Sequence, residues 1–338
     1  MANIRDVARA AGVSIASVSA VVNENGRVGH EARRRVLAAI EVVGYSPNSI
    51  ARSLRRGRSN LIGVVVTDIT NPFSSALVSV FEKAAVARGY SVIICNVDGD
   101  EPRVCAILDQ LRGQHVAGIL LTPGGQGEAL ISQIERHPRP PLVTFDQKLP
   151  GLACDFVGFD NRAAIRLLVD HLAGRGHRRI ALITGRLGRW TADERYHGFI
   201  EAMTDAGLTV EPELVARSGF EGETAYAVTA TLMCAPRPPS AIVAANNVTA
   251  LGALQCCLDL GLDCPGDVSI VGVDDVPWSG LVRPKLSIAS HPVRTMGEVA
   301  TGWLIERIEA PSVSAPREMI LQPEFRPGDS CRDITNVV

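Results

Sequence analysis

The sequence predicts an α/β protein in which a small head of short helices precedes two doubly wound lobes, each built on a parallel sheet. Two observations predict this fold. Apolar residues in the first 45 positions recur with helical spacing, whereas from Leu61 onward short runs of Val, Ile and Leu alternate with helical stretches. Continuous apolar strands separated by helices are typical of parallel sheets covered on both faces. At 338 residues the chain has room for two or three domains.

The head is expected to form a helix-turn-helix unit. Asn3 is a good N-cap for a first helix, which Gly12 ends. Ser14 can cap a second helix over about 15–22, and a third is expected over about 31–43 with its arginine triplet outward. The side chains expected to point inward from the third helix are those of Val36, Leu37 and Ile40. Two helices joined by a glycine-containing turn and supported by a third define the motif.

Charge is distributed unevenly between the head and the rest of the chain. Residues 1–60 hold ten basic and four acidic residues, a net charge of +6, which leaves −8 for the remainder of a chain whose total is −2. A basic head on an acidic body indicates a polyanionic partner, because neutralised phosphates drive affinity for nucleic acid.

A short hinge helix is expected between the head and the core. Ser46 can cap it, Pro47 suits its first position, and Gly57 ends it. This segment has little apolar surface, so we expect it to be stable only against a partner.

The core is expected to contain two similar lobes with a cleft between them, because the strand pattern restarts near residue 161. The predicted strands are LIGVVVTD, YSVIICN, VAGILLTP, PLVTFD and FVGFD, then RRIALITG, AIVAAN and VSIVGVDD. Ligands of such folds bind beyond the carboxyl ends of the strands. The predicted domains are a helix-turn-helix domain (1–45), a hinge helix and linker (46–60), a core N-terminal lobe (61–161 plus 292–320) and a core C-terminal lobe (162–291 plus 321–338).

Motifs along nearly the whole chain carry a family resemblance. They are IRDVARAAGVSIASVSAVVN, YSPNSIARSLRRGRSNLIGVVV, NPF at 71–73, GFDN at 158–161, RGHRRIALITG at 175–185, RYHGF at 195–199, AANN at 244–247 and PGDVSIVGVDD at 265–275. In this order they resemble the LacI/GalR family of transcriptional regulators. The resemblance implies a homodimer with a lambda-repressor-like head, a hinge helix and a core similar to periplasmic sugar-binding proteins. It also implies a regulator, most often a repressor, of catabolic or transport genes, controlled by a small effector in the cleft.

The resemblance places the second helix of the head in the major groove of DNA. The positions matching the usual base-reading residues are Ile15, Ala16 and Ala20, which can offer apolar contacts but no bidentate hydrogen bonds. Ile15 has an alternative role, packing beneath the helix. Phosphate contacts or local caps are expected from Ser14, Ser17, Ser19 and Asn23.

Operator choice is therefore expected to depend on the hinge. By resemblance, Leu54 inserts between bases in the minor groove, which kinks DNA; its alternative role is to pack onto the core. The expected groove-lining and backbone-contacting residues are Asn48, Ala51, Arg52, Ser53 and Arg55. A two-fold dimer predicts a pseudo-palindromic operator in double-stranded DNA.

The resemblance also implies an effector site. Its matching positions are Phe73, Asp146, Asp160, Arg189, Thr191, Arg195, Phe220, Asn246 and Asp274. Trp190 is a further candidate, with a rim or core position as its alternative. A guanidinium fork at Arg195 and a carboxylate at Asp274 suit sugar hydroxyls. With Lys148 expected nearby, Arg189 and Arg195 suggest the hypothesis of a cationic pocket that prefers a sugar acid or phosphorylated sugar to a neutral sugar. Effectors of this family either release DNA, the commoner mode, or strengthen its binding.

Other classes of protein are less consistent with the sequence. The alternative is a periplasmic-type solute-binding protein, but this would need an export signal and would lack residues 1–57. The TPGGQG stretch at 122–127 lacks the ending of a phosphate-binding loop, and the seven histidines show no metal spacing, so neither catalysis, a cofactor nor a metal is expected. No apolar run reaches the ~20 residues of a membrane span. Eight cysteines without a CxxC pair read as reduced thiols, and we expect a cytoplasmic protein.

Overall fold

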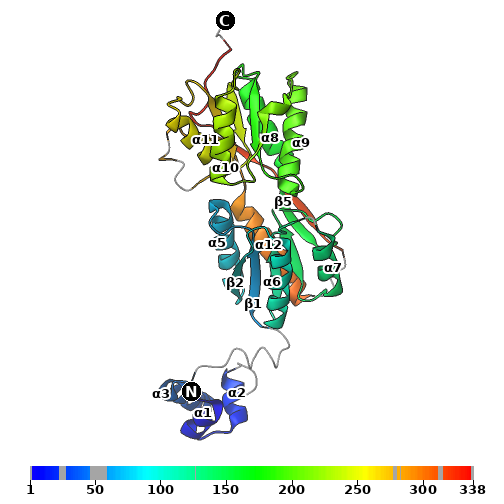
Figure 1. Ribbon diagram of the computed structural model, residues 1–338. Coiled ribbons are helices and arrows are strands. Elements are labelled where there is room, and N and C mark those ends of the chain that lie inside the picture. The colour runs from blue at the N-terminus through cyan, green and yellow to red at the C-terminus, as the bar shows by residue number, and fades with distance from the viewer. Residues whose placement is uncertain are drawn as a thin grey trace. The chain divides into compact units, whose positions relative to one another are not determined.

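The computed structural model describes residues 2–22, 28–45, 59–125, 127–276, 280–281, 283–310 and 315–335. The chain divides into two compact units, residues 1–59 and 60–338 (Figure 1). The hinge residues predicted to contact DNA (Asn48, Ala51, Arg52, Ser53, Leu54 and Arg55) and Asn23 lie outside the described residues.

The head contains the three predicted helices, α1 (Ile4–Ala11), α2 (Ile15–Val22) and α3 (His30–Val43). Asn3 caps α1 in a reciprocal capping box, and Gly12 ends it in the left-handed conformation. The hydroxyl of Ser14 accepts a hydrogen bond from the backbone N–H of Ser17 at 3.1 Å, which is the expected cap of α2. The helices pack around a small apolar core centred on Val7, Val18 and Val36, each fully buried.

One prediction for the head was wrong. Leu37 is half exposed instead of pointing inward. The buried side of α3 is formed by Val36 and Ala39, with Ile40 and Val43 partly buried beside them. This spacing of three, four and seven residues defines one helical face, and Leu37 lies about 100° away from Val36 around the helix.

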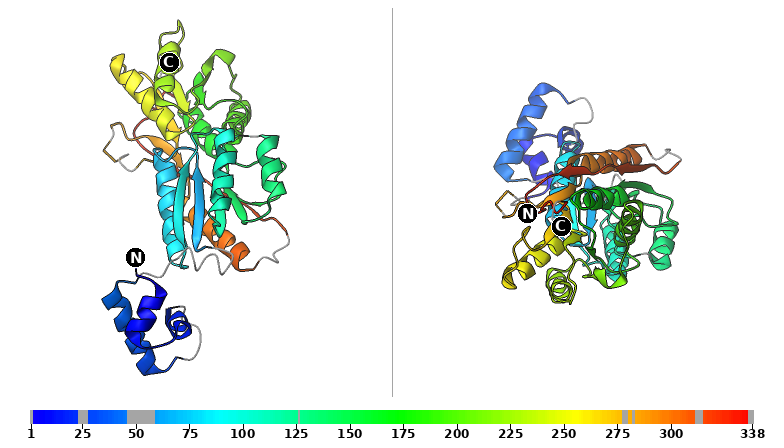
Figure 2. Two further views of the ribbon diagram at one scale, coloured as in Figure 1. Left: turned by 60° about the horizontal axis from the view of Figure 1, so that its bottom comes forward. Right: turned by 90° about the horizontal axis from the view of Figure 1, so that it is seen from above.

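The larger unit contains two six-stranded sheets, each with helices on both faces (Figures 1 and 2). The N-terminal sheet has the order β11-β5-β4-β3-β1-β2, and all its pairs are parallel. Its strands are β1 (Leu61–Val66), β2 (Ser91–Asn96), β3 (Gly118–Leu121), β4 (Leu142–Phe145), β5 (Asp155–Phe159) and β11 (Glu318–Leu321). Its helices are α5 (Pro72–Val86) and α12 (Val293–Glu309), which pack together, and α6 (Glu101–Gly113) and α7 (Glu128–Arg136), which pack in a separate apolar cluster.

The C-terminal sheet repeats this plan with the order β12-β10-β9-β8-β6-β7, and only β12 runs antiparallel among its described pairs. Its strands are β6 (Ile180–Thr184), β7 (Val215–Arg217), β8 (Ala241–Ala244), β9 (Ser269–Val273), β10 (Ser287–Ser290) and β12 (Glu324–Arg326). The paired helices α8 (Asn161–Ala173) and α9 (Trp190–Asp205) pack on one side, and α10 (Gly222–Met233) and α11 (Asn247–Asp259) on the other; a 3-10 turn, η1 (Pro212–Leu214), precedes β7. All eight predicted strands are present. The other four, β7, β10, β11 and β12, are only three or four residues long and have no long apolar run.

The chain crosses between the two lobes three times, and the crossing segments are tied to one another. The crossings follow β5, β10 and β11. The ring of Phe159, at the first, stacks on His291, at the second, with 3.5 Å between centroids. The side chain of Gln322, at the third, donates a hydrogen bond to Asp160 at 3.3 Å. The three crossings therefore form one connected group of segments, which we call the interlobe junction.

None of the described helices is long and apolar enough to cross a membrane. The eight cysteines are free thiols, of which only Cys234 is classed as exposed.

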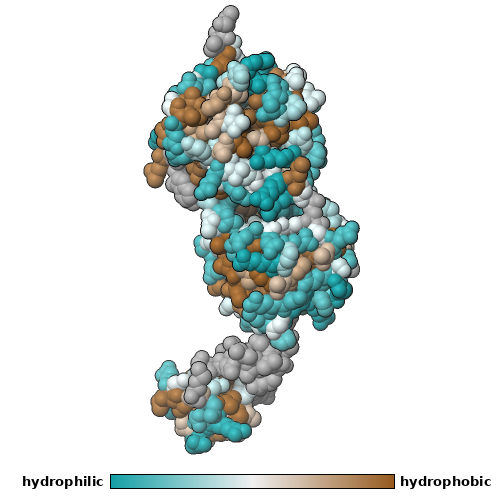
Figure 3. Space-filling view, in the orientation of Figure 1, coloured by the Kyte–Doolittle hydropathy of each residue, from teal (hydrophilic) through white to brown (hydrophobic). Residues whose placement is uncertain are grey.

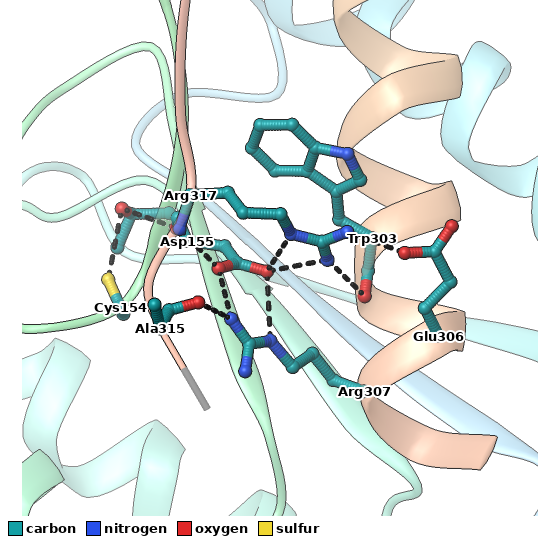
Figure 4. Close-up of polar contacts among 8 residues, drawn as sticks. Cys154, Asp155, Trp303, Glu306, Arg307, Ala315 and Arg317 are labelled. Carbon is teal, nitrogen blue, oxygen red and sulfur yellow. Dashed lines mark hydrogen bonds and ion pairs between the residues drawn. The ribbon is translucent and has the colours of Figure 1, made fainter. Parts of the chain in front are cut away.

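A buried carboxylate at the start of β5 is the centre of a polar cluster in the N-terminal lobe (Figure 4). Asp155 begins β5 with its side chain fully buried, and it accepts hydrogen bonds from Arg307 of α12 and Arg317 before β11, the shortest at 2.6 and 2.8 Å. Burial would raise the pKa of Asp155, but the hydrogen bonds from these arginines hold it below its usual value. The cluster joins the start of β5 to two segments that lie more than 150 residues later in the sequence.

Replacing Asp155 by Asn is expected to destabilise the core by about 3 kcal/mol, because it removes the buried charge that Arg307 and Arg317 share, although Arg317 keeps its ion pair with Glu306. Urea unfolding measures the loss. Asp205→Asn is the matched control, because Asp205 is a 63% exposed carboxylate paired with Arg166 and should cost less than about 1 kcal/mol. The folded-state pKa of Asp155 is depressed, so its contribution is complete above the unfolded value of about 4 and is lost as the pH falls through the folded value. Equal losses for the two variants, or a difference that persists in strong acid, would contradict this account.

Candidate functional site

A cavity of about 300 Å³ lies where loops at the carboxyl ends of both sheets meet. It is the position predicted from the doubly wound topology. Hydrophilic residues predominate where the two lobes face each other (Figure 3). The lining residues are Thr67, Asp68, Asn71, Phe73, Ser74, Asp98, Gly99, Asp146, Gln147, Arg186, Arg189, Thr191, Arg195, Gly219, Phe220, Glu221, Asn246 and Asp274.

Eight of the ten predicted effector residues line this cavity. They are Phe73, Asp146, Arg189, Thr191, Arg195, Phe220, Asn246 and Asp274. Asp160 and Trp190 are not among the lining residues. Asp160 caps α8 by accepting a hydrogen bond from the Ala163 backbone at 2.9 Å, and Trp190 packs edge-on against Phe156. The lining residues not predicted from the sequence include Asn71, Asp98 and Glu221; they lie in loops that follow strands, and Asn71 also belongs to the NPF motif.

Four of the cavity residues adopt a backbone conformation that side-chain-bearing residues rarely use. Five non-glycine residues in the described ranges have positive φ, and four of these, Asp98, Asp146, Phe220 and Asp274, line the cavity. Left-handed backbone is costly for such residues and concentrates at binding and catalytic sites. The concentration marks this cavity as the functional centre of the core.

The central group of the cavity is the buried guanidinium of Arg195, on α9. Its Nε donates to the side-chain oxygen of Asn161 at 2.7 Å, and its Nη1 donates to the carbonyl of Ala245. Burial lowers the pKa of Arg195, while the charges of Asp274 and Asp146 oppose that shift, so the group keeps its proton. Its Cζ also lies 5.8 Å from the centre of the Phe220 ring.

The two carboxylates near Arg195 differ in their surroundings. Burial raises the pKa of Asp146 despite the nearby His291 and Arg195. Burial would raise the pKa of Asp274 as well, but the charge and hydrogen bond of His291, together with Arg195, hold it below its usual value. Asp274 is therefore the more strongly ionised of the two and the better hydrogen-bond acceptor for a ligand hydroxyl.

The expectation of a cationic pocket was wrong. The lining residues include five carboxylates but three guanidinium groups. Lys148 is not among them, because it forms an ion pair with Glu318 at 2.6 Å. Of the arginines, Arg186 pairs with Glu221 at 2.8 Å, and Arg189 donates across the cleft to the carbonyl of Gly99 at 3.3 Å. The charge of Arg186 is therefore already offset by Glu221, whereas Arg189 is held by a neutral carbonyl oxygen.

Of the predicted base-reading positions, Ile15 and Ala16 lie at the start of α2 and Ala20 lies in its last turn. Ser14, Ile15 and Ala16 are exposed, with Ile15 46% exposed, so its packing beneath the helix is at most partial. Ser17, Ser19 and Ala20 are partly buried.

Comparison with known proteins identifies the class. The head matches the model of bacterial regulatory proteins of the lacI family over residues 3–48, and residues 169–331 match a periplasmic binding protein-like domain. The chain is 33% identical to the ribose operon repressor of Escherichia coli K12 over 317 residues, covering 94% of this chain and 96% of the relative. It is 34% identical to the transcriptional repressor PurR of Erwinia tasmaniensis over 310 residues, covering 91% of each. The chain belongs to the LacI family.

Solved structures agree with this assignment. The lac repressor dimer bound to operator and the anti-inducer ONPF superposes with a TM-score of 0.88 at 25% identity, covering 98% of this chain and 99% of that one. A LacI-family regulator from Enterococcus faecium with bound ribose gives a TM-score of 0.71 at 26% identity, covering 81% and 99%. The chain is therefore a DNA-binding repressor of this family with an effector-binding core, and the alternative of a solute-binding protein without a regulatory role is rejected.

Arg195→Gln is expected to destabilise the core by about 3 kcal/mol, because it removes the buried counter-charge of Asp146 and Asp274. Urea unfolding of the full chain tests this. Arg186→Gln is the matched control at the same cavity, since Arg186 is 69% exposed and its ion pair with Glu221 should be worth less than about 1 kcal/mol. A loss for Arg195→Gln no larger than the control's would show that this guanidinium does not stabilise the cavity.

Proposed function

We propose that this repressor binds a pseudo-palindromic operator as a homodimer and releases it when a neutral sugar of about pentose size occupies the cavity. The observation that carries the choice of ligand is the cavity's lining of five carboxylates against three guanidinium groups. Carboxylates accept hydrogen bonds from sugar hydroxyls, whereas they repel the anionic group of a sugar acid.

The individual groups suit such a ligand. Asp274 offers an ionised acceptor, the guanidinium of Arg195 offers donors, and Phe73 and Phe220 offer apolar faces for the C–H side of a sugar ring. Arg189, Thr191, Asn246 and Asp146 complete the proposed contacts, while Asp160 and Trp190 would act on the ligand only from outside the lining. Support for a pentose comes from the similarity to the ribose operon repressor and to the ribose-bound regulator.

We infer that the apolar residues at the start of α2 contribute shape complementarity to the DNA and contacts to thymine methyl groups. The hinge helix supplies most of the discrimination between operator sequences. Ile15 and Ala16 are exposed at that position and lack the donors and acceptors that read guanine or adenine. Leu54 is the proposed wedge in the minor groove. The lac repressor solved as a dimer on its operator supports the homodimer. We further infer that the protein acts in the cytoplasm and catalyses no reaction, since its relatives are named as repressors.

The hinge account predicts unequal effects of two substitutions. Leu54→Ala should weaken operator binding by at least about tenfold, because it removes the side chain that inserts between the bases and kinks the DNA. Ala16→Ser should change the binding free energy by no more than about 0.5 kcal/mol. Gel-shift titrations at one fixed salt concentration measure both, and equal losses would show that the hinge does not dominate.

The effector proposal predicts binding of D-ribose in preference to its acidic counterparts. Isothermal titration of the full chain with D-ribose, D-ribonate and ribose 5-phosphate compares a neutral sugar with two anions. Asp274→Asn should weaken the binding of ribose by about tenfold or more, since it removes an ionised acceptor. Asp275→Asn is the control, because Asp275 pairs with Arg326 and does not line the cavity. Tighter binding of the anions would overturn the neutral-sugar assignment.

A further inference from the structure

His291 lies directly behind the wall of the cavity without lining it. It follows β10 at the second crossing between the lobes, and its side chain is only 1% exposed. Its Nδ1 forms an ion pair with the carboxylate of Asp274, which does line the cavity. No motif or spacing in the sequence singled out this histidine.

The ring of His291 is fixed by aromatic groups of the N-terminal lobe. It stacks on Phe159 with 3.5 Å between centroids and 28° between planes. Phe73, another cavity residue, lies on the ring at 4.6 Å and 43°. These contacts come from the end of β5 and the first turn of α5, whereas Asp274 follows β9 in the other lobe. The imidazole therefore has little freedom to turn away from Asp274.

Asp274 needs such a partner because of where it lies. Its side chain is 6% exposed, and its backbone is left-handed at φ 75°. The charged groups that face this region are Asp274, Asp146 and Arg195. Two carboxylates thus share one guanidinium, and Arg195 already donates to Asn161 and Ala245. The ion-pair contact of His291 Nδ1 gives the Asp274 carboxylate a further partner, and the other nitrogen, Nε2, is buried without a hydrogen-bond partner among the described residues.

We propose that His291 is a positioning residue for the effector: it holds the Asp274 carboxylate in place for a ligand hydroxyl, from a site the ligand does not touch. The inference rests on the proposed function in one respect, that Asp274 accepts a hydrogen bond from the effector. The aromatic contacts serve to fix the donor. Removing the donor frees or protonates Asp274, whereas removing the ring but keeping a donor preserves part of its placement.

Two variants separate these contributions. His291→Phe keeps a ring between Phe159 and Phe73 but removes the donor, and His291→Gln keeps a donor but removes the ring. His177→Gln is the matched control, since His177 is also buried but bonds to Ser240 and Arg332. In titrations of the full chain with D-ribose, His291→Phe should bind at least about tenfold more weakly than wild type, a loss of about 1.4 kcal/mol. His291→Gln should recover a substantial part of that loss, and His177→Gln should bind as wild type.

A second measurement needs no effector. Carbon NMR of the Asp274 carboxyl, identified by its absence in Asp274→Asn, follows its titration in the full chain. The pKa of Asp274 should lie below its usual range in wild type, rise most in His291→Phe, rise less in His291→Gln and stay unchanged in His177→Gln. An unchanged pKa in His291→Phe, or equal rises in both His291 variants, would overturn the proposal. If wild type bound no ribose, the sugar assignment would fail, while the carboxyl titration would still decide the role of His291.

Discussion

The structure of the core depends on one constraint, that the chain passes between its two sheets three times and that the three passages meet. A single connection would let the lobes move in many directions. Three connections, tied by the Phe159–His291 stack and the Gln322–Asp160 hydrogen bond, restrict the two lobes to movement about this interlobe junction. The loops at the carboxyl ends of both sheets therefore face each other over one cavity, and a ligand there contacts both lobes. That arrangement lets binding energy bias the relative position of the lobes.

One strand links the stability of the N-terminal lobe to its function. β5 begins at Asp155, whose carboxylate joins Arg307 and Arg317, and ends at Phe159, which stacks on His291. The polar cluster is at the amino end of the strand and the cavity is at its carboxyl end. The stability of this lobe and the geometry of the cavity therefore depend on opposite ends of the same strand.

The cavity itself is made at a cost in local stability. Four side-chain-bearing residues hold left-handed backbone there, and a guanidinium is buried with two carboxylates nearby. Each feature is unfavourable alone, and each is compensated by neighbours, as in the bonds of Arg195 to Asn161 and Ala245 and the ion pair of Asp274 with His291. Such compensated strain keeps polar groups fixed and aimed at a ligand before it arrives.

The helices of the head and eight of the strands could be predicted from the sequence by itself, because capping residues and apolar periodicity act over a few positions, and the class of protein followed from the resemblance of its motifs to a known family. The same resemblance named Arg195 and Asp274 as effector residues, and both line the cavity. The tertiary structure decided which ion-pair or hydrogen-bond partner each charged side chain has. Lys148 pairs with Glu318, 170 residues away, and so does not add its charge to the cavity. Asp160 caps α8 at the interlobe junction. Leu37 faces outward, and His291 stands behind Asp274. Pairing of charges and rings depends on neighbours brought together only by the fold, and no local pattern encodes it.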